Sequence, residues 1–181
     1  VVYNNIANKG DTAKVMRMFD RVLATPQENA AMTELCVRYL VSVSAPTSQI
    51  KPVLHKMLAI EPEHDTARNQ LLSYAVQEND TAAIKQVCLP AVAYSAADPL
   101  YYYYLGIVYF QQKQYEEAVQ TLSKGLERVQ EDTPIDLISN SYTLLGDLYH
   151  DLGDDEKAYA AYDSCLIYNP EDVGALNNYA Y

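Results

Sequence analysis

The strongest constraint on the fold is a pattern of aromatic, leucine, glycine and alanine residues that occurs twice. In both copies a Tyr is followed by Leu and Gly three and four residues later, by a second Tyr seven residues later, and by an Ala twelve residues after the Gly. The matched positions are Tyr102, Leu105, Gly106, Tyr109, Ala118 and Leu122 in the first copy and Tyr142, Leu145, Gly146, Tyr149, Ala158 and Tyr162 in the second. Such a repeat predicts stacked copies of one supersecondary unit.

Each copy is predicted to form two helices joined by a tight turn. Between residues 101 and 130 apolar residues recur every three or four positions, which is helical periodicity, and the polar run QQKQ divides the segment. In the second copy Gly153 suits the end of one helix and Asp154 the start of the next, and Pro170 follows the expected end of the pair. The chain has only 6 Gly, fewer than a β-sandwich or barrel with many turns usually needs, which also favours helices.

The two copies resemble tetratricopeptide repeats, whose 34-residue pattern contains a large aromatic residue, Leu-Gly, Tyr, Ala and a closing Pro. One departure is that Tyr102 and Tyr142 stand where the family usually has Trp, a change that keeps a large aromatic side chain. The resemblance implies an all-α, right-handed superhelical solenoid of antiparallel helix pairs. It also implies a concave groove that is lined mostly by the first helix of each pair and binds partner proteins.

The repeat period predicts that a single array fills residues 1–181, with six extra residues in a longer second helix or loop around 130–136. Because the last segment resembles the start of another repeat, we expect the chain to be a piece of a longer protein. The predicted divisions are a partial degenerate repeat at 1–30, degenerate repeats at 31–64 and 65–98, a repeat with a six-residue extension at 99–138, a well-matched repeat at 139–172 and the start of a truncated repeat at 173–181.

The three upstream copies lack the Leu-Gly pair, so their assignment depends on the spacing of apolar residues. Turns are expected at residues 9–11 and 78–80, and Pro26 and Pro62 are expected to close two copies. The apolar positions predicted to be in the core are Val15, Phe19, Val22, Val37, Val41, Ile50, Leu54, Met57, Leu71, Ala75, Ile84, Cys88 and Ala91.

The resemblance also implies which side chains face the groove, because the family uses the second, fifth, ninth, twelfth and thirteenth positions of a repeat. These positions are Leu100, Tyr103, Ile107, Phe110 and Gln111 in one repeat, Asn140, Thr143, Asp147, His150 and Asp151 in the next, and Thr66, Asn69, Ser73, Val76 and Gln77 in the copy that starts at Asp65. None is Lys or Arg, so the mode in which one subgroup of the family grips the carboxylate of chaperone peptides is not expected.

The groove is instead predicted to have an aromatic and apolar middle and an acidic end. Exposed aromatic side chains offer a large contact area with few torsions to restrict. We therefore expect a protein or peptide partner with an apolar anchor and a basic flank. The alternative for Tyr103 and Phe110 is that they pack against a neighbouring helix.

Composition and motifs disfavour several other functions. The formal charge of −11 disfavours nucleic acid and anionic membrane surfaces as partners, and no apolar run is long enough for membrane insertion. Cys36, Cys88 and Cys165 lie far apart among apolar neighbours, which predicts structural thiols. The acidic run at 61–65 is assigned to a turn between repeats and not to a metal site. No HExxH, GxSxG or phosphate-binding glycine motif is present, so neither an enzyme nor a cofactor is predicted.

The predicted function is a protein–protein interaction scaffold, and two alternatives stay open. One is a non-catalytic helical accessory region of an enzyme or of a transport or assembly system whose activity lies outside these residues. The other is an architectural or oligomerisation module that works through self-association. The Tyr-rich, Trp-poor repeats and the final ALNNYAY resemble bacterial envelope-associated repeat proteins, which points to the cell envelope or periplasm, with the cytoplasm as the alternative.

Overall fold

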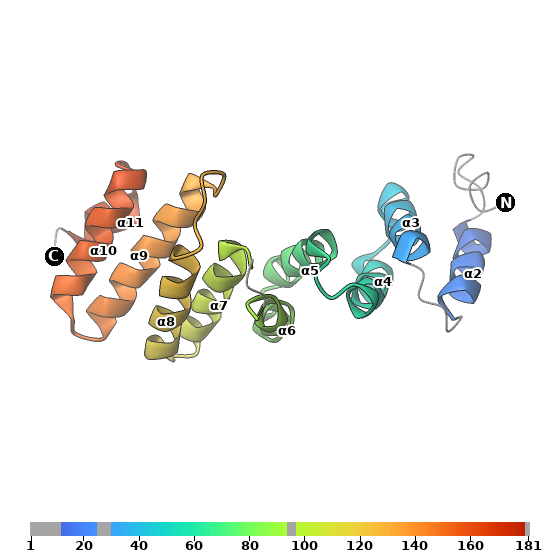
Figure 1. The fold of residues 1–181 in the computed structure, drawn as a ribbon, viewed down its shortest axis with the longest axis horizontal. Helices are drawn as coiled ribbons and strands as arrows, with labels where there is room; N and C mark the ends of the chain where they lie inside the picture. The colour runs from blue at the N-terminus through green and yellow to red at the C-terminus, as the bar shows by residue number, and fades with distance from the viewer. Residues whose placement is uncertain (1–11, 25–29, 94–96, 180–181) are drawn as a thin grey trace. The chain divides into compact units, whose positions relative to one another are not determined.

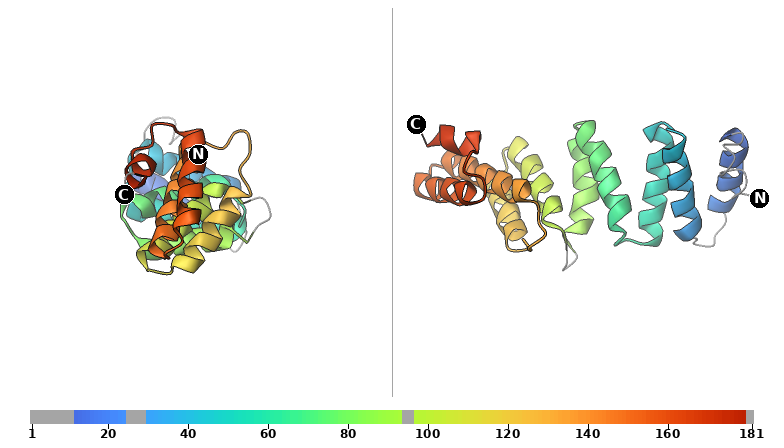
Figure 2. Two further views of the ribbon diagram at one scale, coloured as in Figure 1. Left: turned by 90° about the vertical axis from the view of Figure 1, so that its left-hand side faces the viewer. Right: turned by 90° about the horizontal axis from the view of Figure 1, so that it is seen from above.

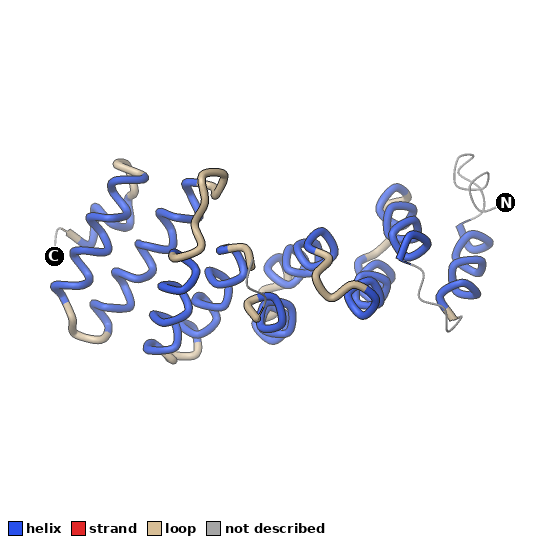
Figure 3. The backbone as a smooth tube through the Cα atoms, in the orientation of Figure 1, coloured by secondary structure: helices blue, strands red, loops and turns tan. Residues whose placement is uncertain are grey.

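The computed structural model describes residues 12–24, 30–93 and 97–179, and within these ranges the chain forms α-helices and no β-strand (Figures 1 and 3). The all-α class predicted from the helical periodicity is therefore confirmed. The chain divides into two compact units, residues 1–78 and 79–181.

The first unit has four described helices. Helix α3 packs against α4 and α4 packs against α5, and the ring of Phe19 on α2 lies 5.9 Å from the ring of Tyr39 on α3. The helices are α2 (Thr12–Leu23), α3 (Ala30–Ser42), α4 (Thr47–Ile60) and α5 (Asp65–Gln77). The expected core residues that are buried here are Val15, Phe19, Val37, Ile50, Leu54, Met57, Leu71 and Ala75.

Val41 is an exception to the predicted core of the first unit. Its side chain is 48% exposed, whereas Cys36 and Leu40 on the same helix are fully buried. The buried residues of α3 are Thr33, Cys36, Val37, Tyr39 and Leu40. The buried face of this helix therefore does not include Val41, and the prediction for Val41 was wrong.

The second unit contains the two well-matched copies. Helices α7 and α8 form one antiparallel pair, α9 and α10 form the next, and α8 packs against α9 (Figures 1 and 2). Lys113 (φ 59°) and Gly153 (φ 78°) adopt the left-handed conformation in the turns inside the two pairs. The helices are α6 (Thr81–Ala91), α7 (Pro99–Gln111), α8 (Tyr115–Leu126), α9 (Ile135–Asp151), α10 (Asp155–Tyr168) and α11 (Val173–Asn178).

Aspartate side chains begin four helices of this unit. Each carboxylate accepts a hydrogen bond from a backbone N–H of the first turn, which otherwise has no partner inside the helix. The negative charge also suits the positive end of the helix dipole. The capping residues are Asp80 for α6, Asp98 for α7, Asp154 for α10 and Asp172 for α11.

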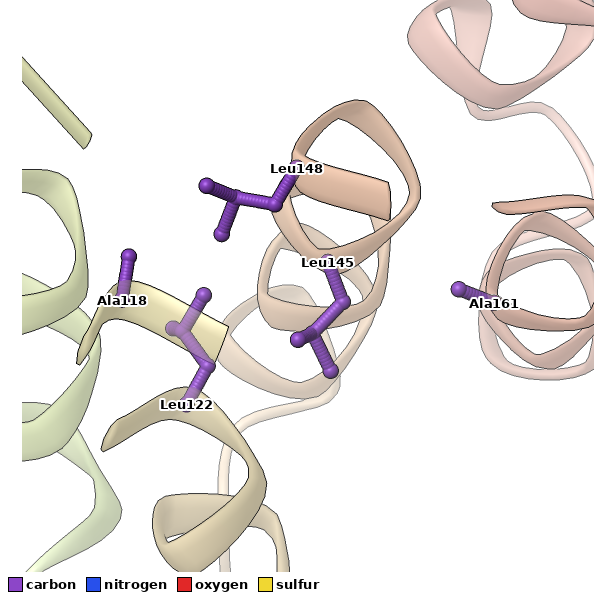
Figure 4. Packing of buried hydrophobic residues seen from close by; sticks show 5 residues of the cluster. All are labelled: Ala118, Leu122, Leu145, Leu148 and Ala161. Carbon is purple, nitrogen blue, oxygen red and sulfur yellow. The ribbon is translucent and has the colours of Figure 1, made fainter. Parts of the chain in front are cut away.

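Residues of the repeated pattern form the core between the two pairs. Ala118 and Leu122 of α8 face Leu145 and Leu148 of α9, and Ala161 of α10 points toward Leu145 (Figure 4). Of the other pattern positions, six are buried and three are half-buried. The buried ones are Tyr102, Leu105, Gly106, Gly146, Ala158 and Tyr162, and the half-buried ones are Tyr109, Tyr142 and Tyr149.

The six extra residues of the first copy lie in the connection to α9 and in the start of α9. Helix α8 has 12 residues and α10 has 14, so the second helix of this copy is not the longer one. The connection at 127–134 is held by a hydrogen bond from the backbone N–H of Gln130 to the Thr133 hydroxyl oxygen, 2.9 Å long. Helix α9 begins directly after Pro134 and has 17 residues, against 13 in α7.

The other expected helix ends are found where the structure describes them. Pro62 follows the end of α4, residues 78–80 separate α5 from α6, and Pro170 follows the end of α10. The expected turn at 9–11 and Pro26 lie outside the described residues, as do the last two residues of the predicted segment 173–181.

Candidate functional site

All ten groove candidates on α7 and α9 lie at least partly on the surface. Six of them are half-buried and four are exposed. The half-buried side chains are Leu100, Tyr103, Ile107, Phe110, Thr143 and Asp147, and the exposed ones are Gln111, Asn140, His150 and Asp151. The candidates on α5, which are Thr66, Asn69, Ser73, Val76 and Gln77, belong to the first unit and are exposed except for the half-buried Val76.

Four of these candidates come together at one pocket of about 500 Å³ in the second unit. Asp147, His150 and Asp151 are spaced three and four residues apart and so share one face of α9, and Phe110 comes from the end of α7. The other lining residues are Asp155, Ala158, Tyr159 and Tyr162 of α10 and Asn178 of α11. We call this site the acidic pocket.

Asp147 is the centre of a hydrogen-bond network that joins three helices. The Tyr162 hydroxyl donates to Asp147 Oδ1 over 2.9 Å, and the Asn178 amide donates to the same oxygen over 2.7 Å and to the Tyr162 oxygen over 3.1 Å. Burial is the largest influence on this carboxyl and raises its pKa, the two hydrogen bonds oppose that effect, and the negative charge of Asp151 adds to it. Burial and the bond to Asp147 also raise the pKa of the Tyr162 hydroxyl, which keeps it a donor.

The rim of the pocket carries a negative charge. The described lining contains three aspartates, and its one titratable base is His150, whose Nδ1 lies 3.1 Å from Asp155 Oδ1. Lys157 is close in sequence to the pocket residue Asp155, but its side chain forms an ion pair with Asp154 and lies over the ring of Tyr149. Carboxylates gathered in a concave site raise the local concentration of cationic groups.

Aromatic side chains form the apolar part of the same pocket. Phe110 is half-buried, with its ring centroid 5.8 Å from that of Tyr115. Tyr159 is 41% exposed, and its ring lies 5.5 Å from that of Tyr179. The Tyr179 hydroxyl donates to Asp163, and this bond, with some help from burial, raises the pKa of Tyr179 to about 12. The pocket therefore offers both aromatic surface and carboxylates to a bound group.

The remaining candidates of α7 and α9 do not line this pocket. Tyr103 packs on the core cluster around Leu122 and Leu145, with its ring 5.4 Å from that of Tyr104, which is the alternative considered for it. The Thr143 hydroxyl donates to the Ser139 carbonyl oxygen over 3.1 Å and lies 3.4 Å from Asp172 Oδ1, at the start of α11. Phe110 fits both alternatives, because it contacts the core cluster and lines the pocket.

Five of the lining side chains were not among the groove candidates. Asp155, Ala158, Tyr159 and Tyr162 lie on a second helix, and Asn178 lies on the helix that follows the pair. A signal for the α10 residues exists in the sequence, because Asp155, Tyr159 and Tyr162 are spaced four and three residues apart and must share one helix face. Nothing in the spacing tells that this face meets Asp147 of α9.

In the part of the chain that the structure describes, no three His, Cys, Asp or Glu side chains are grouped so that they could hold a metal ion. Within the same residues, no helix has both the length and the apolar character needed to cross a membrane.

The described helices define a helical repeat protein made of antiparallel pairs. Residues 98–166 match the model of the tetratricopeptide repeat family, so this part of the chain consists of tetratricopeptide repeats, as the repeated pattern predicted. A comparison with curated proteins gave no match.

Several solved structures share the fold. The protein in the crystal structure of MamA is 18% identical in sequence to this chain, and the two structures align with a TM-score of 0.61. The alignment covers 100% of this chain and 98% of that chain. MamA from Desulfovibrio magneticus RS-1 is 16% identical in sequence, with a TM-score of 0.57, and the alignment covers 94% of this chain and 92% of that chain. BtubC from P. vanneervenii is 17% identical, with a TM-score of 0.54, and the alignment covers 96% of this chain and 77% of that chain. At this identity the likeness shows the fold, and it confirms the predicted class, a solenoid of helix pairs.

Proposed function

We propose that the chain is a non-catalytic scaffold that binds a segment of a partner protein at the acidic pocket. Tetratricopeptide repeats are in general protein–protein interaction modules. The observation that carries the proposal is that Phe110, Asp147 and Asp151, which come from the first helices of two successive pairs, converge on one pocket. First helices are the part of such repeats that forms the binding surface.

The chemistry of the pocket favours a segment with an apolar side chain next to a basic one. Phe110 and Tyr159 offer aromatic surface to the apolar side chain, and an aromatic face also attracts a cation. Asp151 and Asp155 are exposed at the rim, where a Lys or Arg can reach them without the cost of burying a charge. This supports the partner expected from the sequence, one with an apolar anchor and a basic flank.

The test is a selection from a displayed library of random peptides against the whole chain. Peptides enriched on the chain are expected to contain Lys or Arg close to Leu, Phe or another large apolar residue. Their affinity, measured by fluorescence anisotropy, is expected to fall about tenfold or more in Asp151→Asn and in Phe110→Ala, since buried aromatic and charged contacts dominate binding.

Glu117→Gln is the matched control for Asp151→Asn. It removes the same charge from an exposed position on α8 that does not line the pocket, and it is expected to leave affinity within about twofold. Circular dichroism checks that Phe110→Ala still folds. Absence of enriched peptides, or equal loss in Glu117→Gln and Asp151→Asn, contradicts the proposal.

A second candidate function is self-association, which a group of exposed apolar side chains favours. Ile167 at the end of α10 is 78% exposed, and Val173 and Leu176 of α11 are 68% and 47% exposed. Exposed apolar groups that are close in sequence favour association between chains. Sedimentation velocity at several concentrations tests this: a dimer that Ile167→Ser weakens supports it, and a monomer at all concentrations excludes it.

A further inference from the structure

Another pocket, of about 370 Å³, lies within the first unit between α3, α4 and α5. Its buried lining is apolar: Val37 of α3 and Leu54 and Met57 of α4 are at most 8% exposed, and Val41 of α3 is 48% exposed. The other lining residues are Glu34, Arg38 and Ser42 of α3, His64, which caps α5, and Thr66, Ala67 and Gln70 of α5. We call this site the apolar pocket.

The repeat period relates the apolar pocket to the well-matched copies. Two periods of about 34 residues separate the copy that starts at Ala31 from the copy that starts at Pro99. At this offset α3 and α4 fall on α7 and α8 to within two residues at each helix end. Six lining residues, Glu34, Val37, Arg38, Val41, Leu54 and Met57, then correspond to Tyr102, Leu105, Gly106, Tyr109, Leu122 and Gly125. The apolar pocket thus lies where a well-matched copy has the residues that join its two helices.

In α7 and α8 these positions are tightly packed around an aromatic side chain. Tyr102 is 4% exposed, and a Cβ atom at Gly125 would lie 2.6 Å from its Cβ. A Cβ atom at Gly106 would lie 2.6 Å from Leu122 Cδ2. The two glycines therefore allow α7 and α8 to approach closely and to bury the Tyr102 ring.

The first unit has different side chains at these positions. Arg38 and Met57 stand where the second unit has the two glycines, and Glu34 stands where it has Tyr102. Because only glycine fits the close contact, α3 and α4 cannot pack in the same way. Glu34 also supplies no ring to fill the space. The apolar pocket is therefore the place of an aromatic ring that this copy lacks.

We propose that the apolar pocket binds an uncharged aromatic small molecule of one or two rings. Its size fits, because an apolar cavity of about 150 Å³ already takes up benzene, and ligand pockets commonly begin at about 300 Å³. The thioether of Met57 and the guanidinium of Arg38 both attract aromatic rings, so an aromatic ring is favoured over a saturated one.

The polar lining favours a ligand with a hydroxyl group and without a charge. Glu34 and Arg38 form an ion pair with each other, so neither selects a charged ligand. His64 Nδ1 accepts a hydrogen bond from the Ala67 N–H over 3.2 Å, so the ring proton is on Nε2, where it can be donated to a hydroxyl oxygen. The site shares no residue with the acidic pocket and does not depend on the proposed function.

The test uses 2-naphthol as the probe and its fully hydrogenated counterpart as the control ligand. The whole chain is labelled with carbon-13 at the methyl groups of its 4 methionines, of which Met57 lines the pocket. In NMR spectra 2-naphthol is expected to shift the Met57 signal, which Met57→Leu assigns, with a Kd of about 100 μM or lower. The saturated alcohol is expected to bind about tenfold or more weakly.

Val41→Trp tests the place of binding, because a large side chain at this exposed position closes the pocket. It is expected to weaken the binding of 2-naphthol about tenfold or more. Ala59→Trp makes a similar addition at an exposed position of α4 outside the lining, and is expected to keep the affinity within about twofold. Circular dichroism checks that both variants fold.

Three results would overturn the inference. They are an unchanged Met57 signal up to the solubility limit of 2-naphthol, equal binding of the saturated alcohol, and equal affinity in Val41→Trp and the wild type. None of these results bears on the scaffold function, which concerns the acidic pocket. Phe110→Ala and Asp151→Asn should bind 2-naphthol like the wild type, and a loss in either variant would place the probe at the acidic pocket and contradict the inference.

Discussion

Gly146 on α9 lies directly against the ring of Tyr162 on α10. A Cβ atom at Gly146 would be 2.2 Å from Tyr162 Cε1 and 2.5 Å from Cδ1, far inside van der Waals contact. The Tyr162 side chain is 3% exposed, and its hydroxyl is bonded to Asp147 one residue along α9 from Gly146. The same contact therefore fixes the spacing of the helix pair and the position of the carboxylate in the acidic pocket.

Gly146→Ala is expected to lower the free energy of unfolding by about 1–3 kcal/mol, the usual cost of overpacking a core. The ring of Tyr162 cannot move away without leaving its hydrogen bonds. Urea unfolding followed by far-ultraviolet circular dichroism measures the loss.

Gly153→Ala separates crowding from backbone conformation. Nothing lies within 4 Å of a Cβ at Gly153, but its φ is +78°, so the expected cost is about 1–2 kcal/mol from strain alone. Replacing Tyr162 by Leu in the Gly146→Ala background makes room and is expected to recover part of the loss in that variant, while leaving the cost at Gly153 unchanged. No recovery would mean that the ring contact is not the cause.

Asp147→Asn is expected to stabilise the folded chain at neutral pH, with a benefit that disappears in acid. Burial raises the pKa of Asp147 in the folded state above its usual 3.8, so the folded state takes up its proton first as the pH falls. Above the raised pKa the wild type bears the cost of a partly buried charge, and below 3.8 the carboxyl is neutral in both states. The difference between the two unfolding midpoints should therefore shrink as the pH falls through this range.

The same measurement on Asp151→Asn is the control, because Asp151 is exposed. Asp151→Asn should change the unfolding midpoint at neutral pH less than Asp147→Asn does. A benefit of Asp147→Asn that grows toward low pH would contradict the sign of the shift.

The three thiols are expected to resist alkylation in the folded chain. Cys36, Cys88 and Cys165 are all fully buried and form no disulfide, as the apolar surroundings in the sequence predicted. Burial, with a smaller contribution from the charge of Asp20, raises the pKa of Cys36 to about 12, so its reactive thiolate is rare at neutral pH. Iodoacetamide at pH 8 followed by mass spectrometry should show little modification without urea and modification of all three in urea. Rapid labelling of Cys36 in the folded chain would contradict its burial.

Asp172→Ala is expected to loosen α11 from the second helix pair. The Asp172 carboxylate accepts a hydrogen bond from the Ala175 N–H over 2.9 Å, and a lost N-cap costs about 1 kcal/mol. Hydrogen exchange should become faster at the amides of α11. Asp98→Ala, which removes the cap of α7, is the control: it should not change exchange in α11, and an equal change there would show that the effect is not local.

The sequence predicted the helices of the second unit well because their signals are local. Apolar spacing, the aspartate caps and the residues of the tight turns act within a few positions of each other, so they can be read without the fold. The repeated Tyr, Leu-Gly and Ala pattern predicted not only single helices but also the pairing of α7 with α8 and of α9 with α10. Val41 shows the limit: it is exposed while Cys36 and Leu40 on the same helix are buried, and apolar spacing alone did not show which apolar side chains neighbouring helices would cover.

For the acidic pocket, the lining residues on α7 and α9 were predicted from the sequence, and those on α10 and α11 were found only in the tertiary structure. Phe110, Asp147, His150 and Asp151 were predicted because the resemblance to tetratricopeptide repeats implies that these repeat positions face the groove. Which faces meet depends on how helices pack across turns, and that packing brought Tyr159, Tyr162 and Asn178 to the same place. Only the packed structure could show that Asp147 is partly buried and bonded to two other helices, because burial and hydrogen bonding between distant residues are properties of the assembled chain.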